Sequence, residues 1–90
     1  MVRFAMLQYL GEHIWEPGET KKAIIALQRA VGYNPYDADA LSMLGELYAL
    51  EDEGNEIALS LYQQAVNIDD RHWKYWYRLA LVRFRIASYE

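Results

Sequence analysis

The chain has 90 residues, 53% of them hydrophobic and 24% charged, with a formal net charge of −4 and no cysteine. This length allows at most one small domain, and the apolar content is typical of a folded chain. The absence of cysteine excludes disulfides, thiolate metal sites and cysteine nucleophiles. Arg3, Gln8 and Glu12 interrupt the apolar positions near the start, which lacks the pattern of a signal peptide or membrane span. We therefore expect a soluble, cytoplasmic protein with no membrane partner.

The charge is distributed unevenly along the chain. Residues 1–70 carry four basic and twelve acidic side chains, whereas residues 71–90 carry five basic side chains and one acidic side chain. An acidic body argues against non-specific binding to a phosphate backbone, but the basic last segment leaves that possibility open locally.

Apolar spacing and turn residues predict an all-α fold. Pro17-Gly18 is expected to end the first helix, and Asn34-Pro35 to separate the second helix from the third, because a residue before proline avoids the helical region. Asp37 and Asn55 are candidate N-caps. The five predicted helices lie at about residues 3–16, 19–32, 37–51, 55–68 and 71–88.

The same order of small and large residues recurs about every 35 residues. Each repeating unit is expected to contain two helices. In its first helix, two leucines and a glycine lie along one side, and Tyr48 continues this side in the second unit. In the second helix, a small, a large and a small residue lie at i, i+4 and i+7, a face suited to close helix packing. A third copy of the first helix has Trp76, Leu79 and Ala80 at these positions. The expected packing residues of the two full copies are Leu7, Leu10, Gly11, Ala23, Leu27 and Ala30, then Leu41, Leu44, Gly45, Ala58, Tyr62 and Ala65.

The pattern of one unit resembles the tetratricopeptide repeat. It consists of Leu-x2-Leu-Gly-x2-Tyr, then Gly, then Ala-x3-Tyr-x2-Ala and an acidic residue or proline. The resemblance covers two full repeats, at residues 4–37 and 38–72, and the first helix of a third, at 73–90. It implies a right-handed α-α superhelix of about five helices. It also leads us to expect either a fragment of a longer protein or a natural end capped by the last helix. The pattern is broken at Arg83, where a large apolar residue would lie.

The resemblance implies a non-catalytic scaffold that binds a peptide or partner surface in a concave groove lined by the first helices. This groove would be acidic in the first two repeats and basic in the third, so a peptide with an acidic end and a basic or apolar end would fit it. The alternative is a solvated face with incidental charges. The expected groove residues are Tyr9, Glu12, Asp39, Met43, Glu46, Lys74, Tyr77, Arg78, Leu81 and Arg85.

The segment 71–88 leaves two other functions open. It interleaves aromatic and basic residues, which can stack on RNA or other single-stranded nucleic acid, although Trp76 occupies a repeat position and is expected in the core. It is also apolar nearly all the way round. A further repeat or a second copy of the chain is therefore expected to cover one side, which makes structural self-association the remaining alternative.

Other site classes have little support in the sequence. Lys74 and Arg78 resemble a basic pair of the family members that clamp a terminal carboxylate, but Gln8, Glu12 and Met43 replace the other donors. The two histidines lie far apart in the sequence, no glycine-rich phosphate loop occurs, and the acidic turn at 51–53 lacks the ligand spacing of a calcium loop. We predict no enzymatic activity, no metal, no cofactor and no small-molecule substrate.

Overall fold

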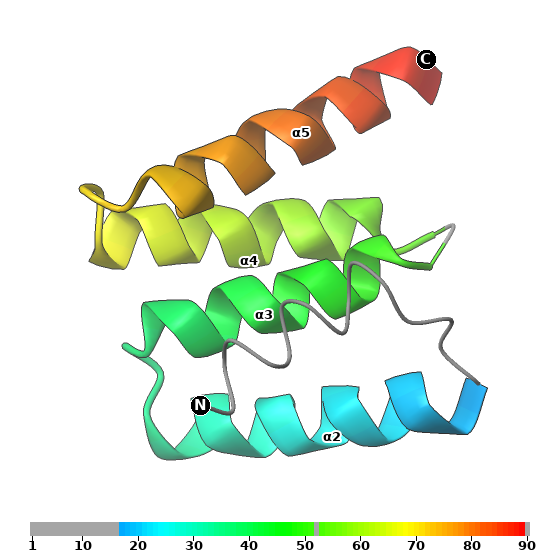
Figure 1. Cartoon of the computed structure of the whole chain (residues 1–90), viewed down its shortest axis with the longest axis vertical. Helices are drawn as coiled ribbons and strands as arrows, with labels where there is room; N and C mark the ends of the chain where they lie inside the picture. Colours follow the sequence, from blue (N-terminus) through cyan, green and yellow to red (C-terminus); the bar gives the residue numbers. More distant parts are fainter. Residues whose placement is uncertain (1–16, 52, 90) are drawn as a thin grey trace.

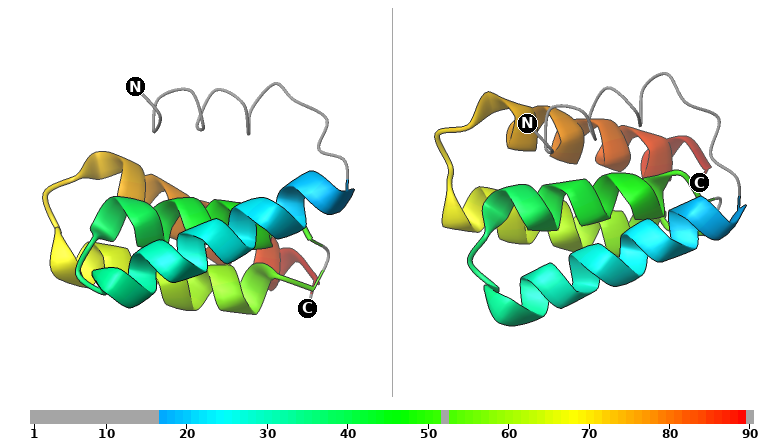
Figure 2. Two further views of the ribbon diagram at one scale, coloured as in Figure 1. Left: turned by 90° about the horizontal axis from the view of Figure 1, so that it is seen from below. Right: turned by 60° about the horizontal axis from the view of Figure 1, so that its bottom comes forward.

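The computed structural model describes residues 17–51 and 53–89, which form four α-helices and no strand. The helices are α2 (Pro17–Tyr33), α3 (Ala38–Ala49), α4 (Asn55–Ile68) and α5 (Trp73–Tyr89). They lie side by side in chain order (Figure 1, Figure 2), and α2 packs on α3, α3 on α4, and α4 on α5. The predicted all-α class is confirmed for this part of the chain. The helix predicted at 3–16 lies outside the described residues.

Capping residues set where the helices begin. Asp37 caps α3 as predicted: its backbone is extended, and its carboxylate accepts a hydrogen bond from the backbone N–H of Ala40 at 3.1 Å. Pro17 is the first residue of α2, a position where the missing N–H of proline costs nothing, whereas the helix that Pro17-Gly18 is expected to end lies outside the described residues. The prediction that Asn55 is an N-cap is wrong, because Gly54 is the N-cap of α4 and Asn55 is the first helical residue.

Helix α3 is the centre of the packed part of the molecule. Eight of its 12 residues are buried, so little of its surface reaches solvent. On one side Leu44 and Leu47 pack with Ile24 of α2. On the other side Leu41 belongs to a cluster that continues through α4 into α5. The helix therefore joins two apolar clusters, which explains why its sequence is apolar on more than one face.

Helix α5 buries a different stripe from the one that the repeat predicts. Tyr75, Leu79 and Val82 are at most 3% exposed and pack in the cluster shared with α4. Trp76, expected in the core, is 48% exposed, and Ala80 is exposed as well. The prediction that these two residues are buried is wrong because α5 packs along the stripe at i, i+4 and i+7 from Tyr75, and Trp76 and Ala80 point to another side. Ala30 at the end of α2 is also exposed.

Two glycines are required by space rather than by backbone conformation, since neither has a positive φ. A Cβ atom on Gly45 would lie 2.6 Å from a ring carbon of Tyr62, and this ring is itself only 4% exposed. A Cβ atom on Gly54 would lie 1.8 Å from the carbonyl oxygen of Tyr48. The close contact of α3 with α4 therefore depends on Gly45, and the turn between them depends on Gly54.

We expect Gly45→Ala and Gly54→Ala to lower the free energy of unfolding by about 1–3 kcal/mol, because each added methyl group overlaps packed atoms. The effect should be larger at Gly54, where the overlapped atom belongs to the backbone. Gly32→Ala in α2 is the matched control, since no atom lies within 4 Å of its added Cβ. Urea denaturation followed by circular dichroism measures all three. Equal stability of the Gly45→Ala and Gly32→Ala proteins would contradict the α3–α4 contact.

Candidate functional site

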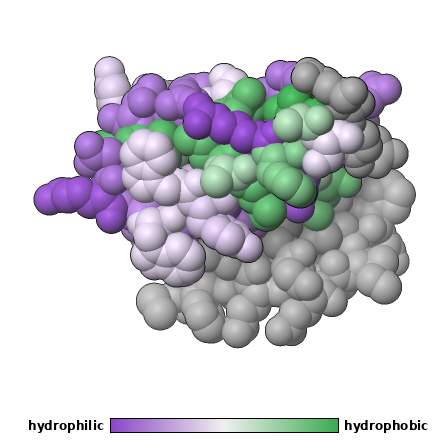
Figure 3. Space-filling view, turned by 90° about the horizontal axis from the view of Figure 1, so that it is seen from above, coloured by the Kyte–Doolittle hydropathy of each residue, from purple (hydrophilic) through white to green (hydrophobic). Residues whose placement is uncertain are grey.

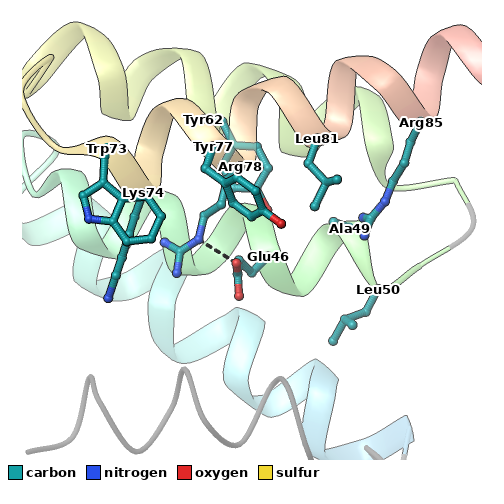
Figure 4. A pocket seen from close by; sticks show the side chains of 10 residues that line it. All are labelled: Glu46, Ala49, Leu50, Tyr62, Trp73, Lys74, Tyr77, Arg78, Leu81 and Arg85. Carbon is teal, nitrogen blue, oxygen red and sulfur yellow. Dashed lines mark ion pairs between the residues drawn. The ribbon is translucent and has the colours of Figure 1, made fainter.

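An open cleft of about 600 Å³ lies between α3 and α5 (Figure 4). Helix α3 and its C-cap residue form one wall, α5 forms the other, and a nearly buried tyrosine of α4 reaches the cleft between them. The lining residues are Glu46, Ala49 and Leu50, then Tyr62, and then Trp73, Lys74, Tyr77, Arg78, Leu81 and Arg85.

The packing of α5 determines which of its side chains face the cleft. Its buried stripe, which begins at Tyr75, fixes the rotation of the helix. Lys74, Arg78 and Arg85 lie at i, i+4 and i+11, on the adjacent side, so all three cations point towards one space. Figure 4 shows Lys74 at one end of the cleft, Arg85 at the other and Arg78 between them.

Arg78 connects the two walls of the cleft. Its Nε atom lies 2.6 Å from Oε1 of Glu46, and its Nη1 atom donates a hydrogen bond to Oγ of Ser42 at 2.5 Å. Ser42 is fully buried, and the side chains of Arg78 and Glu46 are 12% and 25% exposed. Because these groups are largely removed from water, the ion pair contributes more than an exposed pair would.

A second side-chain contact across the same two helices supports this arrangement. The Tyr75 hydroxyl donates a hydrogen bond to Oδ1 of Asp39. Asp39 and Tyr75 are 36 residues apart, as are Ser42 and Arg78. Helices α3 and α5 are therefore held in one register by two polar contacts, which fixes the width of the cleft between them.

The cleft combines excess positive charge with exposed aromatic surface. Among the described residues that line it, three are cations and Glu46 is the one acidic side chain. Trp73 is 67% exposed and packs edge-on against Tyr77, with ring centres 6.3 Å apart. The Lys74 ammonium lies 5.9 Å from the centre of the Trp73 ring, within the range of a cation–π contact. This wall offers an anionic or apolar ligand both charge and flat contact area.

Tyr62 contributes a neutral hydroxyl to the cleft. Burial raises the pKa of Tyr62 far above its ordinary value near 10, and the nearby Glu46 carboxylate raises it further. The residue therefore remains protonated at physiological pH. It can form hydrogen bonds, but it is not suited to accept and release protons as a general acid or base.

The structure brings together six of the ten predicted groove residues: Glu46, Lys74, Tyr77, Arg78, Leu81 and Arg85 all line the cleft. Met43 does not, because α3 is buried on that side and its side chain is only 7% exposed. Asp39 borders a different cleft, where it is bonded to Tyr75. Tyr9 and Glu12 lie outside the described residues.

The sequence pattern did not assign Trp73 to the groove, and it placed Tyr62 only in repeat packing. Both line the cleft. The signal for Trp73 was its position four residues before Tyr77, which puts both rings on one side of a helix. No feature of the sequence indicated that Tyr62 lines the cleft. Its spacing predicts only that its ring packs on Gly45, and a ring that does so can still reach the cleft with its hydroxyl end.

A second cleft, of about 680 Å³, lies where the α2–α3 turn meets the α4–α5 turn. The two turns have the same local structure: Oδ1 of Asn34 accepts a hydrogen bond from the Tyr36 N–H, and Oδ1 of Asp69 accepts one from the Arg71 N–H, each at 3.2 Å. Several aspartates line this cleft, but the described residues contain no group of three or more acidic, histidine or cysteine side chains arranged to hold a metal ion. We assign these side chains to turn formation.

No protein-family model matches the chain, and comparisons with curated proteins and with solved structures find no match. None of the four described helices combines the length and the apolar character needed to cross a membrane.

We expect Arg78→Met to lower the free energy of unfolding by about 1–3 kcal/mol, because it leaves the Glu46 carboxylate and the buried Ser42 hydroxyl without their partner. Adding Glu46→Gln should restore part of this loss, since the unpaired charge is then removed. Lys74→Met, at another cation of the same helix, should change stability by less than about 0.5 kcal/mol. A thermal or urea denaturation series measures these differences, and identical effects of Arg78→Met and Lys74→Met would refute the pairing.

The raised pKa of Tyr62 predicts a loss of stability at alkaline pH. Above pH ~10 the unfolded chain releases this proton while the folded chain retains it, so the free energy of unfolding falls as the pH rises, by up to ~1.4 kcal/mol per pH unit. Below pH ~10 the stabilisation that comes from the retained proton of Tyr62 is fully present. Tyr62→Phe should flatten the decline, whereas Tyr36→Phe, at a side chain that is 77% exposed, should not. Guanidinium denaturation between pH 8 and about 11 compares the three proteins.

Proposed function

We propose that this chain is a non-catalytic interaction domain of the tetratricopeptide-repeat type, in which the cleft between α3 and α5 binds an extended peptide segment of a partner protein. The observation that carries the proposal is the composition of this cleft. It has cations at both ends, the ion pair of Arg78 with Glu46 in the middle and exposed aromatic rings along one wall. Such a surface suits binding by charge and apolar contact.

The repeat assignment is supported by contacts at equivalent positions. The small residue Gly45 faces Tyr62, in the way that the small-large-small spacing requires. The turns after α2 and α4 have matching hydrogen bonds at positions 35 residues apart. Stacked hairpins of this kind would extend into an α-α superhelix, with the cleft on its concave side.

The positions of the cations suggest the chemistry of the ligand. Lys74 and Arg85 are 11 residues apart on α5, which corresponds to roughly 16 Å along a helix. An extended peptide covers this distance with about five residues. We therefore propose a ligand with acidic residues about five positions apart and an apolar or aromatic residue between them, which would contact Tyr77 and Leu81.

Two labelled peptides of equal length test this proposal by fluorescence polarisation. One carries aspartates about five residues apart around a Leu-Phe pair, and the other carries lysines in place of the aspartates. We expect only the acidic peptide to bind, and we expect Lys74→Glu and Arg85→Glu each to weaken it at least about tenfold. Lys22→Glu, an exposed charge reversal in α2 away from the cleft, is the control.

A labelled single-stranded oligonucleotide separates this function from nucleic-acid binding. A peptide-binding cleft should not retain the oligonucleotide at physiological salt. If the oligonucleotide binds with an affinity that falls steeply with salt while the acidic peptide does not bind, the peptide proposal is wrong and α5 is a nucleic-acid surface.

A further inference from the structure

The side of α5 that faces neither α4 nor the cleft carries an exposed apolar stripe, formed by Trp76, Ala80, Phe84 and Ala87 at i, i+4, i+8 and i+11. All four residues are exposed, with Trp76 at 48% and Phe84 at 71%. We call these four residues the outer stripe. Figure 3, which views the molecule from the α5 side, shows hydrophobic residues and residues of intermediate hydropathy across the middle of this face, with hydrophilic ones at its left end, along its upper edge and between them.

One large side chain of the outer stripe, that of Trp76, is held in place by a hydrogen bond. The indole Nε1 of Trp76 donates a hydrogen bond to the backbone carbonyl of Asp70 at 2.7 Å, which fixes the ring at the beginning of α5. On its other side the helix is buried along the stripe that begins at Tyr75. A ligand would therefore meet a Trp76 ring that it does not need to order first.

The internal repeat shows what kind of surface covers such a stripe. Trp76 and Ala80 lie 35 residues after Leu41 and Gly45. On α3 these equivalent positions are covered by α4: Leu41 is 1% exposed in the cluster that contains Tyr62, and Gly45 faces the Tyr62 ring. The covering face of α4 has a small residue, an aromatic residue four positions later and a small residue three positions after that.

We propose that the outer stripe of α5 is a docking surface for an amphipathic helix of a partner protein, which has this small-aromatic-small face and acidic residues on its flanks. The charge of α5 supports the second requirement. Residues 71–89 include five basic side chains and no acidic one, and Arg83 lies beside the stripe. An acidic helix would be attracted to this surface, and a basic helix would be repelled.

A second copy of the described residues does not offer this face. In α4 the small-aromatic-small residues are already covered, since Ala58 and Ala65 are 0% exposed and Tyr62 is 4% exposed. In α2 the equivalent residues Ala23 and Leu27 pack against the cluster of α3. Pairing of two α5 helices would bring two basic segments together, which is unfavourable. These observations disfavour a second copy of the described residues as the source of the helix.

The chain itself supplies a suitable probe: a synthetic peptide of residues 53–70, which contains the Ala58, Tyr62 and Ala65 face and four acidic residues. We expect the labelled peptide to bind the whole chain, and we expect Trp76→Glu and Phe84→Glu to weaken binding at least about tenfold. Both substituted residues are exposed, so circular dichroism should show that the variants remain folded. A peptide with Tyr62→Lys should not bind.

A variant in the cleft distinguishes binding at the outer stripe from the proposed binding in the cleft. Leu81→Ala, a change in the cleft that leaves the charge of α5 unaltered, should leave binding of the 53–70 peptide nearly unchanged, so the two surfaces can fail separately. If the peptide instead replaces the chain's own α4, its binding will not depend on Trp76, and that outcome overturns the proposal. Sedimentation that shows a dimer dissociated by Trp76→Glu would also overturn it, because a second copy would then cover the stripe. Absence of binding by a peptide shown to be helical is the third contradicting result.

Discussion

The close contact between α3 and α4 at Gly45 is the constraint on which the rest of the structure depends. Because Gly45 has no side chain, the Tyr62 ring can occupy the space above it and bring the two helices together. That contact leaves α3 buried on most sides and makes it the common core of both apolar clusters. It also carries Tyr62 to the edge of the cleft. The packing of α3 on α4 and the shape of the candidate site therefore have one physical origin.

Helix α5 has three surfaces with different chemistry, and its rotation determines where each one points. Tyr75, Leu79 and Val82 are buried against the core, and this leaves the basic side facing the cleft and the outer stripe facing solvent. The two polar contacts with α3, from Tyr75 to Asp39 and from Arg78 to Ser42 and Glu46, hold that rotation. Three of the five basic side chains in residues 71–90, Lys74, Arg78 and Arg85, therefore line the cleft, whereas Arg71 borders the second cleft and Arg83 donates a hydrogen bond to Gln63 of α4.

The sequence alone was sufficient for the all-α class, the bounds of α4 and the cap at Asp37, because these depend on local spacing and on side chains that bond to nearby backbone. The resemblance to the tetratricopeptide repeat also indicated six of the ten described residues that line the cleft. It failed at Trp76 and Met43, whose burial depends on which neighbouring helices are present and how closely they pack. A repeat pattern indicates which residues a neighbouring helix can bury. Which residues are in fact buried depends on how the helices pack together.

The cleft and the outer stripe share α5 but should act independently. For a ligand on one surface to alter the other, it would have to rotate or shift α5, and such a motion must break contacts that hold the helix to its neighbours. Those contacts include the ion pair of Arg78 with Glu46 and the burial of Leu79, which is 1% exposed. Trp73 and Tyr77 line the cleft, and both of their rings are largely exposed. Under the two proposals above, a helix with two outward surfaces would allow one domain to join two partners, because neither ligand would have to displace the other.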